Sequence, residues 1–212
     1  MKRLLSVTLM LMLSVFAVAG QELSDDVRKI YDACVALRTA AEAGSAPQMR
    51  EANMRLKDVR TAYFGTLRQV SGEKVSMNGH MVFDYEFVDS LLVNRKVYSF
   101  AQKYLDRTAR RGASSSSTVF MKTCCVKAED SVKYSFKAQD KQELALVTEP
   151  GGLVNVKVYD SRNDIWHNDD DGLNAGKSAH VRVFDIPEGM TDIVVEVINK
   201  TDKDRSFVII SN

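Results

Sequence analysis

The chain has 212 residues, with 29 lysines and arginines against 28 aspartates and glutamates, and its formal net charge is +1. This balance lacks the basic field that binding to nucleic acid or to an anionic membrane requires, so both are excluded as expected partners. Hydrophobic residues make up 45% of the chain, and a chain of this length can bury a sufficient core without disulfides.

The first 20 residues have the pattern of an export signal. Lys2 and Arg3 precede an apolar run over residues 4–19, which ends in the small residues of AVAG. As a helix this run would span roughly 24 Å, short of the ~30 Å hydrocarbon core of a membrane. The pattern predicts a removable signal peptide over 1–20 rather than an anchor. We therefore expect an exported protein, periplasmic or extracellular, with no transmembrane segment in its mature chain.

The chain contains three cysteines, Cys34, Cys124 and Cys125. An odd number does not close into a complete disulfide framework. Cys124 and Cys125 are adjacent, and neighbouring residues of a strand point to opposite faces. We therefore expect thiols that act as small apolar side chains, with at least one of this pair buried, and no essential disulfide.

A first helix is predicted after Ser24 or Asp25, either of which can serve as its N-cap. An apolar stripe at spacings of three and four follows, formed by Val27, Ile30, Tyr31, Cys34, Leu37 and Ala41. Such spacing places these side chains on one face of a helix. Gly44 supplies a stop signal.

A second helix is predicted from Ser45, with Pro47 in its first turn and Gln48 three residues after the cap. These residues match an N-terminal capping pattern. Its apolar stripe consists of Met49, Ala52, Leu56, Val59 and Tyr63. Two helices separated by so short a break predict an antiparallel helical hairpin.

Residues 64–80 give a weaker pattern, with short strands expected at 64–67 and 74–77 around the turn signal of Ser71 and Gly72. A third helix is predicted from residue 89 or 90 to residue 111. We therefore expect a mainly helical domain over residues 21–113. The polar connector at 113–117, rich in serine, would end it.

From Thr118 onward the apolar residues alternate, as they do in strands. Eight strand-like segments follow, at 118–127, 131–138, 142–149, 153–160, 165–168, 178–186, 191–199 and 205–211. Short strands at such intervals predict an antiparallel β-sandwich, a jelly roll of about eight strands, over residues 118–212. No crossover helix interrupts them, so a parallel sheet is not expected. The fold class is therefore predicted to be α+β.

Three segments of this part carry a resemblance to a known family: LVNVKVYDSRND at 153–164, AHVRVFDIPEG at 179–189 and IVVEVINKTDKDRSFVII at 193–210. They resemble the pre-peptidase C-terminal modules found beside peptidases in secreted bacterial proteins. The shared elements are Asp160 at a strand end, the Pro187-Glu188-Gly189 turn and the valine-rich strand from Val194 to Asn199. The resemblance covers about residues 125–212 and implies a binding or accessory role rather than catalysis.

An acidic cluster between two of these strands is the first candidate site. It contains Asp160, Asp164, Asn168, Asp169, Asp170 and Asp171. Calcium takes six to eight oxygen ligands, and loops rich in Asp and Asn supply them. The string lacks the EF-hand spacing, however, and exposed turns are commonly acidic. We expect a solvated loop rather than a tight calcium site.

The second candidate is Trp166, the only tryptophan, together with His167. An exposed indole beside carboxylates can stack on a sugar ring, although a single tryptophan in a small sandwich also serves as core or edge packing. Both readings remain open from the sequence alone.

No pattern in the chain identifies a catalytic residue, a cofactor or a zinc site. The three histidines are outside any HExxH or paired CxxC pattern, and the serine run lacks GxSxG. The sequence therefore predicts a secreted, non-catalytic binding or interaction protein of the bacterial cell envelope, with a protein or glycan partner. The alternative is a small secreted hydrolase or peptidase-associated accessory factor whose site lacks a recognisable motif.

Overall fold

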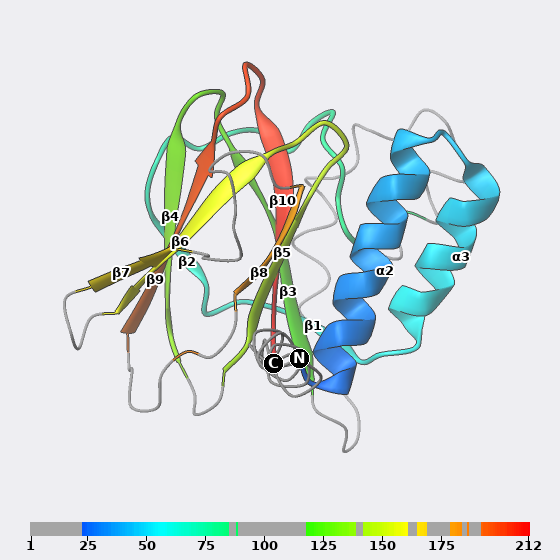
Figure 1. Ribbon diagram of the computed structural model, residues 1–212, viewed down its shortest axis with the longest axis horizontal. Coiled ribbons are helices and arrows are strands. Elements are labelled where there is room, and N and C mark those ends of the chain that lie inside the picture. Colours follow the sequence, from blue (N-terminus) through cyan, green and yellow to red (C-terminus); the bar gives the residue numbers. More distant parts are fainter. Residues whose placement is uncertain are drawn as a thin grey trace, which may run out of the picture.

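The computed structural model describes residues 23–84, 88, 118–138, 142–160, 165–168, 179–183, 186 and 192–212. These residues form an α+β structure, two helices and a β-sandwich of ten strands (Figure 1). The predicted export signal at 1–20, the third helix at 89–111 and the connector at 113–117 lie outside the described residues.

The two helices are α2 (Asp25–Glu42) and α3 (Ala46–Lys57). Gly44 separates them at a φ of +64°, which confirms the predicted stop. Ser24 and Ser45 occupy the N-cap positions, but neither side chain makes the capping hydrogen bond that the sequence pattern predicts. The Ser24 hydroxyl instead donates to the carboxylate of Glu143 at 2.8 Å, which attaches the start of α2 to the sandwich.

The prediction that the second helix reaches Tyr63 is wrong, because the helix ends at Lys57. The chain then forms β1 (Thr61–Tyr63), which pairs with residues 119–121. Edge pairing thus satisfies backbone groups that a longer helix would have bonded internally. The next strand, β2 (Arg68–Ser71), also falls outside the short strands expected at 64–67 and 74–77.

Residues 118–212 contribute the remaining eight strands, one in each of the eight predicted segments. They are β3 (Val119–Val126), β4 (Ser131–Lys137), β5 (Leu144–Thr148), β6 (Val154–Asp160), β7 (Ile165–Asn168), β8 (His180–Val183), β9 (Asp192–Asn199) and β10 (Arg205–Ser211). Their predicted strand character is therefore confirmed for the described residues of this part.

The strands form two five-stranded sheets. Sheet A has the order β1-β3-β10-β5-β8, and sheet B has the order β2-β4-β9-β6-β7. All pairs are antiparallel except β1 with β3, which is parallel. This parallel pair departs from the sequence expectation. It arises because β1 comes from residues 61–63, inside the range assigned to the helical domain (21–113), and joins an edge of a sheet built by residues 118–212.

The molecule has three layers, with the helices on one side, sheet A in the middle and sheet B on the other side (Figure 1). One core fills the space between the two sheets and includes Phe136, Val195 and Phe207. A second core lies between sheet A and the helices and includes Ile30, Leu37 and Val208. Among the described residues, sheet A is therefore covered on both faces, whereas sheet B is covered on one.

No helix among the described residues has the length and apolar character needed to cross a membrane.

Gly72 follows β2 and fixes the edge of sheet B against the start of β4. Its φ is +91°, and an added Cβ would lie 2.7 Å from the carbonyl oxygen of Ser131. Gly79 has a φ of +84°, but an added Cβ there would meet no atom within 4 Å. Both glycines thus have a left-handed backbone, but only at Gly72 would an added Cβ contact another part of the chain.

We predict that Gly72→Ala lowers the free energy of unfolding more than Gly79→Ala does. Both substitutions incur the left-handed backbone cost of roughly 1–2 kcal/mol. Only Gly72→Ala adds a clash with the backbone, worth about 1 kcal/mol or more. Urea unfolding of the two variants measures the difference, and equal losses would show that β2 does not approach β4 this closely.

Candidate functional site

The structure places only part of the sequence-predicted site. Asp160 ends β6, and Trp166 and His167 lie in β7. Asp164, Asp169, Asp170 and Asp171 lie outside the described residues. Within the described ranges no three His, Cys, Asp or Glu side chains are grouped as metal ligands would be. The expectation that this acidic loop is not a tight calcium site stays a prediction.

The two predicted ligand residues, Trp166 and His167, are neighbours in β7 and pair with different residues of β6. Trp166 is paired with Tyr159 of β6, and His167 is paired with Val158. Paired residues of antiparallel strands share a face, and neighbours along a strand lie on opposite faces. Tyr159 is half-buried and Val158 is buried in the sandwich core. The register therefore pairs Trp166 with an outer-face position of β6 and His167 with an inner-face position of β6.

Two rows of residues cross the outer face of sheet B from edge to edge. What we call the aromatic row consists of Arg68, Ser135, Val194, Tyr159 and Trp166, one from each strand. What we call the charged row consists of Ser71, Lys133, Glu196, Lys157 and Asn168. Along β4 and β9 these residues are half-exposed, and their neighbours in sequence are buried. In Figure 1 this face is directed away from the helices.

Ion pairs between neighbouring strands neutralise the carboxylates of this face. Lys133 Nζ lies 3.6 Å from Glu196 Oε1, and Lys137 Nζ lies 3.8 Å from Asp192 Oδ1. The Ser131 hydroxyl also hydrogen-bonds Glu196 at 3.2 Å. The exposed Lys137–Asp192 pair adds little stability, and both pairs fix the positions of polar groups on this face.

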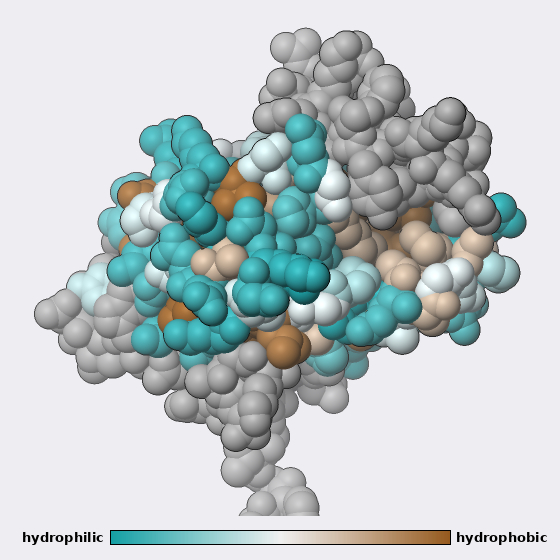
Figure 2. Space-filling view, turned by 90° about the horizontal axis from the view of Figure 1, so that it is seen from above, coloured by the Kyte–Doolittle hydropathy of each residue, from teal (hydrophilic) through white to brown (hydrophobic). Residues whose placement is uncertain are grey.

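The end of the sandwich that carries the β9–β10 hairpin is mainly hydrophilic (Figure 2). Among the described residues, the exposed large apolar side chains are Met54 in α3 and Val70 in β2. They lie in different layers and form no common patch. The described surface therefore offers polar recognition rather than a broad apolar interface.

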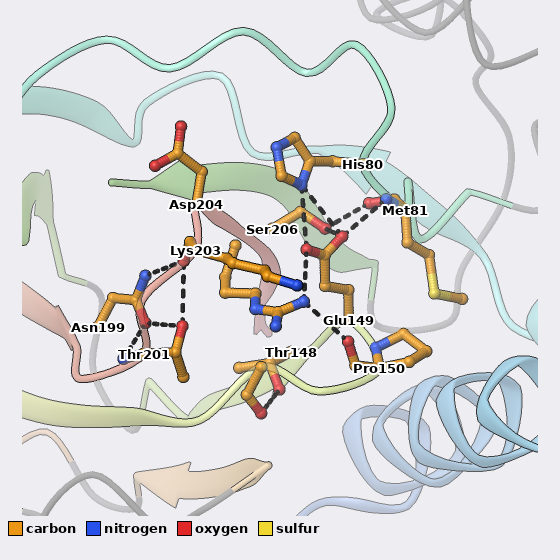
Figure 3. A network of polar contacts seen from close by, with 12 residues as sticks. His80, Met81, Thr148, Glu149, Pro150, Asn199, Thr201, Lys203, Asp204 and Ser206 are labelled. Atoms are coloured by element: carbon orange, nitrogen blue, oxygen red, sulfur yellow. Dashed lines mark hydrogen bonds and ion pairs between the residues drawn. The ribbon is translucent and has the colours of Figure 1, made fainter. Parts of the chain in front are cut away.

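A second candidate site surrounds Glu149, a buried carboxylate just after β5 (Figure 3). It accepts hydrogen bonds from His80 Nδ1 at 3.0 Å and from the Met81 amide at 3.0 Å. The Ser206 hydroxyl lies 2.8 Å from the carboxylate and 2.8 Å from the Met81 carbonyl oxygen. Arg205 Nη1 is 3.7 Å from the carboxylate and donates to the Pro150 carbonyl oxygen at 3.2 Å.

These contacts attach residues 75–83, which we call the covering segment, to the end of sheet A. Met77 and Val82 of this segment pack with Cys125. The Phe83 amide donates to the Thr123 hydroxyl at 3.2 Å. The covering segment thus continues the layer begun by the helices on the same side of sheet A.

The Glu149 site shifts the pKa of both titratable partners. Hydrogen bonding to Glu149 raises the pKa of His80 above its usual 6.5, although burial acts in the opposite direction. Burial alone would raise the pKa of Glu149, but the bonds from the imidazole, the Met81 amide and the Ser206 hydroxyl outweigh it. The pKa of Glu149 is therefore below its usual 4.5.

Ser206, His80 and Glu149 have the residue types of a hydrolytic triad but not its arrangement. In a triad the histidine lies between the nucleophile and the carboxylate and accepts the hydroxyl proton. Here Glu149 lies between the other two, and Ser206 is fully buried. The arrangement stabilises a buried carboxylate and does not activate a nucleophile.

The side chain of Asn199, whose polar atoms all form hydrogen bonds, holds the neighbouring hairpin between β9 and β10. The Asn199 amide donates to the carbonyl oxygens of Lys127 and Lys203, and its oxygen accepts from the Thr201 amide and hydroxyl. Asn199 is fully buried. Its four bonds account for its burial without a ligand.

Sequence reasoning missed the Glu149 site because its parts are far apart in the chain. His80 precedes Glu149 by 69 residues, and Ser206 follows it by 57. The local signals were the Asn78-Gly79 turn beside His80 and the Pro150-Gly151 turn beside Glu149, and each indicates a turn rather than a contact. Tyr159 was missed for the same reason, since pairing between strands makes it a neighbour of Trp166.

The three cysteines are free and buried, which goes beyond the expectation that at least one of Cys124 and Cys125 is buried. Cys34 packs with the helices, Cys124 lies between the sheets and Cys125 lies under the covering segment. Cys124 and Cys125 thus occupy opposite faces of β3. Burial raises the pKa of Cys124 to about 11 and also raises those of Cys34 and Cys125. Such thiols are poor nucleophiles.

No protein-family model and no curated protein sequence matches the chain. A solved structure similar to it is the periplasmic lysozyme inhibitor of g-type lysozyme from Salmonella Typhimurium, with a TM-score of 0.31 and 9% identity over 48% of this chain and 93% of that one. A CBM61 module in complex with β-1,4-galactotriose has a TM-score of 0.27 and 11% identity over 44% and 81%.

A GH115 4-O-methyl-α-glucuronidase with specificity for decorated arabinogalactans has a TM-score of 0.28 and 9% identity, covering 88% of this chain and 28% of its own. These similarities assign no ligand or activity to this chain.

We predict that Glu149→Gln lowers the free energy of unfolding by about 3 kcal/mol, because it breaks the pairing of a buried carboxylate with the partly buried His80 and Arg205 side chains. The matched variant Glu51→Gln removes an exposed helix pair with Arg55 and should cost less than about 0.5 kcal/mol. Denaturant unfolding compares the two, and similar losses would show that Glu149 is not a buried anchor.

The Glu149 site should also give stability a mildly acidic optimum. The raised pKa of His80 contributes stability that is complete below 6.5 and is lost as pH rises through its folded pKa. The lowered pKa of Glu149 contributes stability that is complete above 4.5 and is lost as pH falls through its folded pKa. Both contributions are complete between these values. His80→Gln should remove the loss on the alkaline side, and an unchanged pH profile would contradict this.

We further predict that a thiol reagent labels no cysteine rapidly in the native protein and labels all three after unfolding. Reductant should leave the melting temperature unchanged, because a disulfide worth about 2–4 kcal/mol is absent. Mass spectrometry of the labelled protein measures the first outcome. Rapid native labelling of Cys125 would show that the covering segment does not shield it.

Proposed function

We propose that this protein is an exported, non-catalytic binding protein that recognises a glycan through the outer face of sheet B. The observation that carries this proposal is the difference between the two sheets. Both faces of sheet A are covered, whereas the outer face of sheet B is half-exposed across its central strands.

The composition of this face favours a glycan over an apolar partner. Tyr159 and Trp166 hold paired register positions at the β6–β7 edge, and aromatic residues are of the type that stacks on sugar rings. Ser131, Ser135 and Asn155 supply hydrogen-bonding groups among the half-exposed positions. A few placed polar groups around aromatic surface are typical of small-ligand recognition.

A protein partner is the alternative within the same class, and the polar face would also serve it. The hydrolase alternative is favoured only by the presence of serine, histidine and glutamate in the Glu149 site. Their order and the burial of Ser206 make that site a structural anchor instead. Export and the resemblance to pre-peptidase C-terminal modules stay predictions that agree with a binding role.

We predict that Tyr159→Ala and Trp166→Ala each weaken binding by about tenfold for glycans that the protein retains on an array of purified polysaccharides. A lost stacking ring is worth roughly 1.5 kcal/mol, which corresponds to such a factor. Tyr63→Ala is the matched control, because Tyr63 is also half-buried but lies in β1 of sheet A.

Circular dichroism spectra would verify that all three variants fold. If the wild-type protein binds no glycan, or if Tyr63→Ala weakens binding as much as Tyr159→Ala does, the proposed function is wrong.

A further inference from the structure

We propose that the glycan bound by the outer face of sheet B is anionic and lies along the aromatic row, with its acidic groups held by Arg68 and Lys157. This inference rests on the proposed function and specifies the ligand class. It follows from the charges that remain on the face after its internal ion pairs are counted.

Among the described residues, the outer face carries more cations than its own carboxylates neutralise. Asp192 and Glu196 are each paired with a lysine of β4. Arg68 and Lys157 have no ion-pair partner among the described residues. Because both lie on the two rows that cross the sheet, the described residues of this face carry a local excess of two positive charges, although the whole chain is close to neutral.

The two cations are placed where a ligand on the aromatic row would meet them. Lys157 and Tyr159 are two residues apart on β6, so they share a face and lie about 7 Å apart. A sugar stacked on Tyr159 would bring its ring substituents near the Lys157 ammonium group.

Arg68 lies at the opposite end of the aromatic row, four strand spacings or about 19 Å from Trp166. An oligosaccharide of several rings spans this length. Its acidic groups would therefore meet one cation beside the stacking platform and a second at the β2 edge, with Ser135 and Val194 between them.

Two separated cations suit a polymer with occasional acidic groups rather than a dense polyanion. Nucleic acid carries a phosphate at every nucleotide and is bound by proteins that neutralise many of them. A sugar chain with carboxylate or sulfate groups has a lower charge density and also presents ring faces for stacking. Arginine additionally matches a carboxylate or sulfate with two parallel hydrogen bonds.

The test uses a pair of probes that differ only in charge. Isothermal titration of the full-length protein with an oligogalacturonate, and with the same oligosaccharide fully methyl-esterified, should give about tenfold tighter binding of the acidic form. Affinity for the acidic form should fall with added salt, because these cations lie on the surface.

The double variant Arg68→Ala/Lys157→Ala should lose about tenfold in affinity for the acidic form and little for the ester. The matched control is Lys74→Ala/Lys200→Ala, which removes two exposed lysines outside the two rows and lowers the net charge equally. It should bind both probes as the wild-type protein does.

A sulfated galactan oligosaccharide is the third probe. If it binds in place of the oligogalacturonate and depends on the same two cations, the anionic class is supported with sulfate as the charged group.

Equal affinity for acid and ester, with Tyr159 still required, overturns this inference and leaves the proposed function intact. Equal losses in the two double variants mean non-specific electrostatic attraction and also overturn it. If the binding of no glycan depends on Tyr159, the proposed function itself is overturned.

Discussion

The structure depends on the burial of sheet A from both sides. In β10, Phe207 and Ile209 face the core between the sheets, whereas Val208 and Ile210 face the helices. Each such side chain contributes about 1.5–3 kcal/mol when it is fully removed from water. A two-layer sandwich would leave one of these sets exposed. The helices and the covering segment supply the missing layer, and sheet B, apolar on its inner face, supplies the other.

The Glu149 site follows from the same requirement. α2 packs on the central strands of sheet A, and the end of the sheet near Cys125 is covered by residues 75–83, which form no regular element apart from a turn. A segment without internal backbone pairing has to be held by side chains. Glu149 does so by accepting from an imidazole, an amide and a hydroxyl. These bonds offset the cost of burying its charge.

The alternating part of the fold could be predicted from the sequence because half-buried strands have a period of two. In β4, Val132, Tyr134 and Phe136 are buried between half-exposed neighbours. β1 and β2 were not predicted, because β1 is a three-residue strand that pairs with the distant β3, and β2 lies in a segment of weak pattern. The second helix was extended too far because Val59 continues its apolar spacing and is buried, although it lies beyond the helix end.

The candidate site could be predicted only where one residue carried the signal. Trp166 stood out as the single tryptophan, but its partner Tyr159 and the alignment with Arg68 depend on the pairing of five strands. Strand register is non-local, so no sequence window contains it. The separation of His167 from Trp166 follows from strand geometry once both are known to lie in β7.

The central claim is that recognition uses the open outer face of sheet B and not the covered side of the molecule. An NMR titration of the isotope-labelled protein with a glycan that it binds on the polysaccharide array tests this claim most directly. The account predicts amide shift changes at Ser135, Val194 and Tyr159, on three adjacent strands, with the amides of α2 and α3 unchanged. Shift changes confined to the two helices or to the covering segment would contradict it.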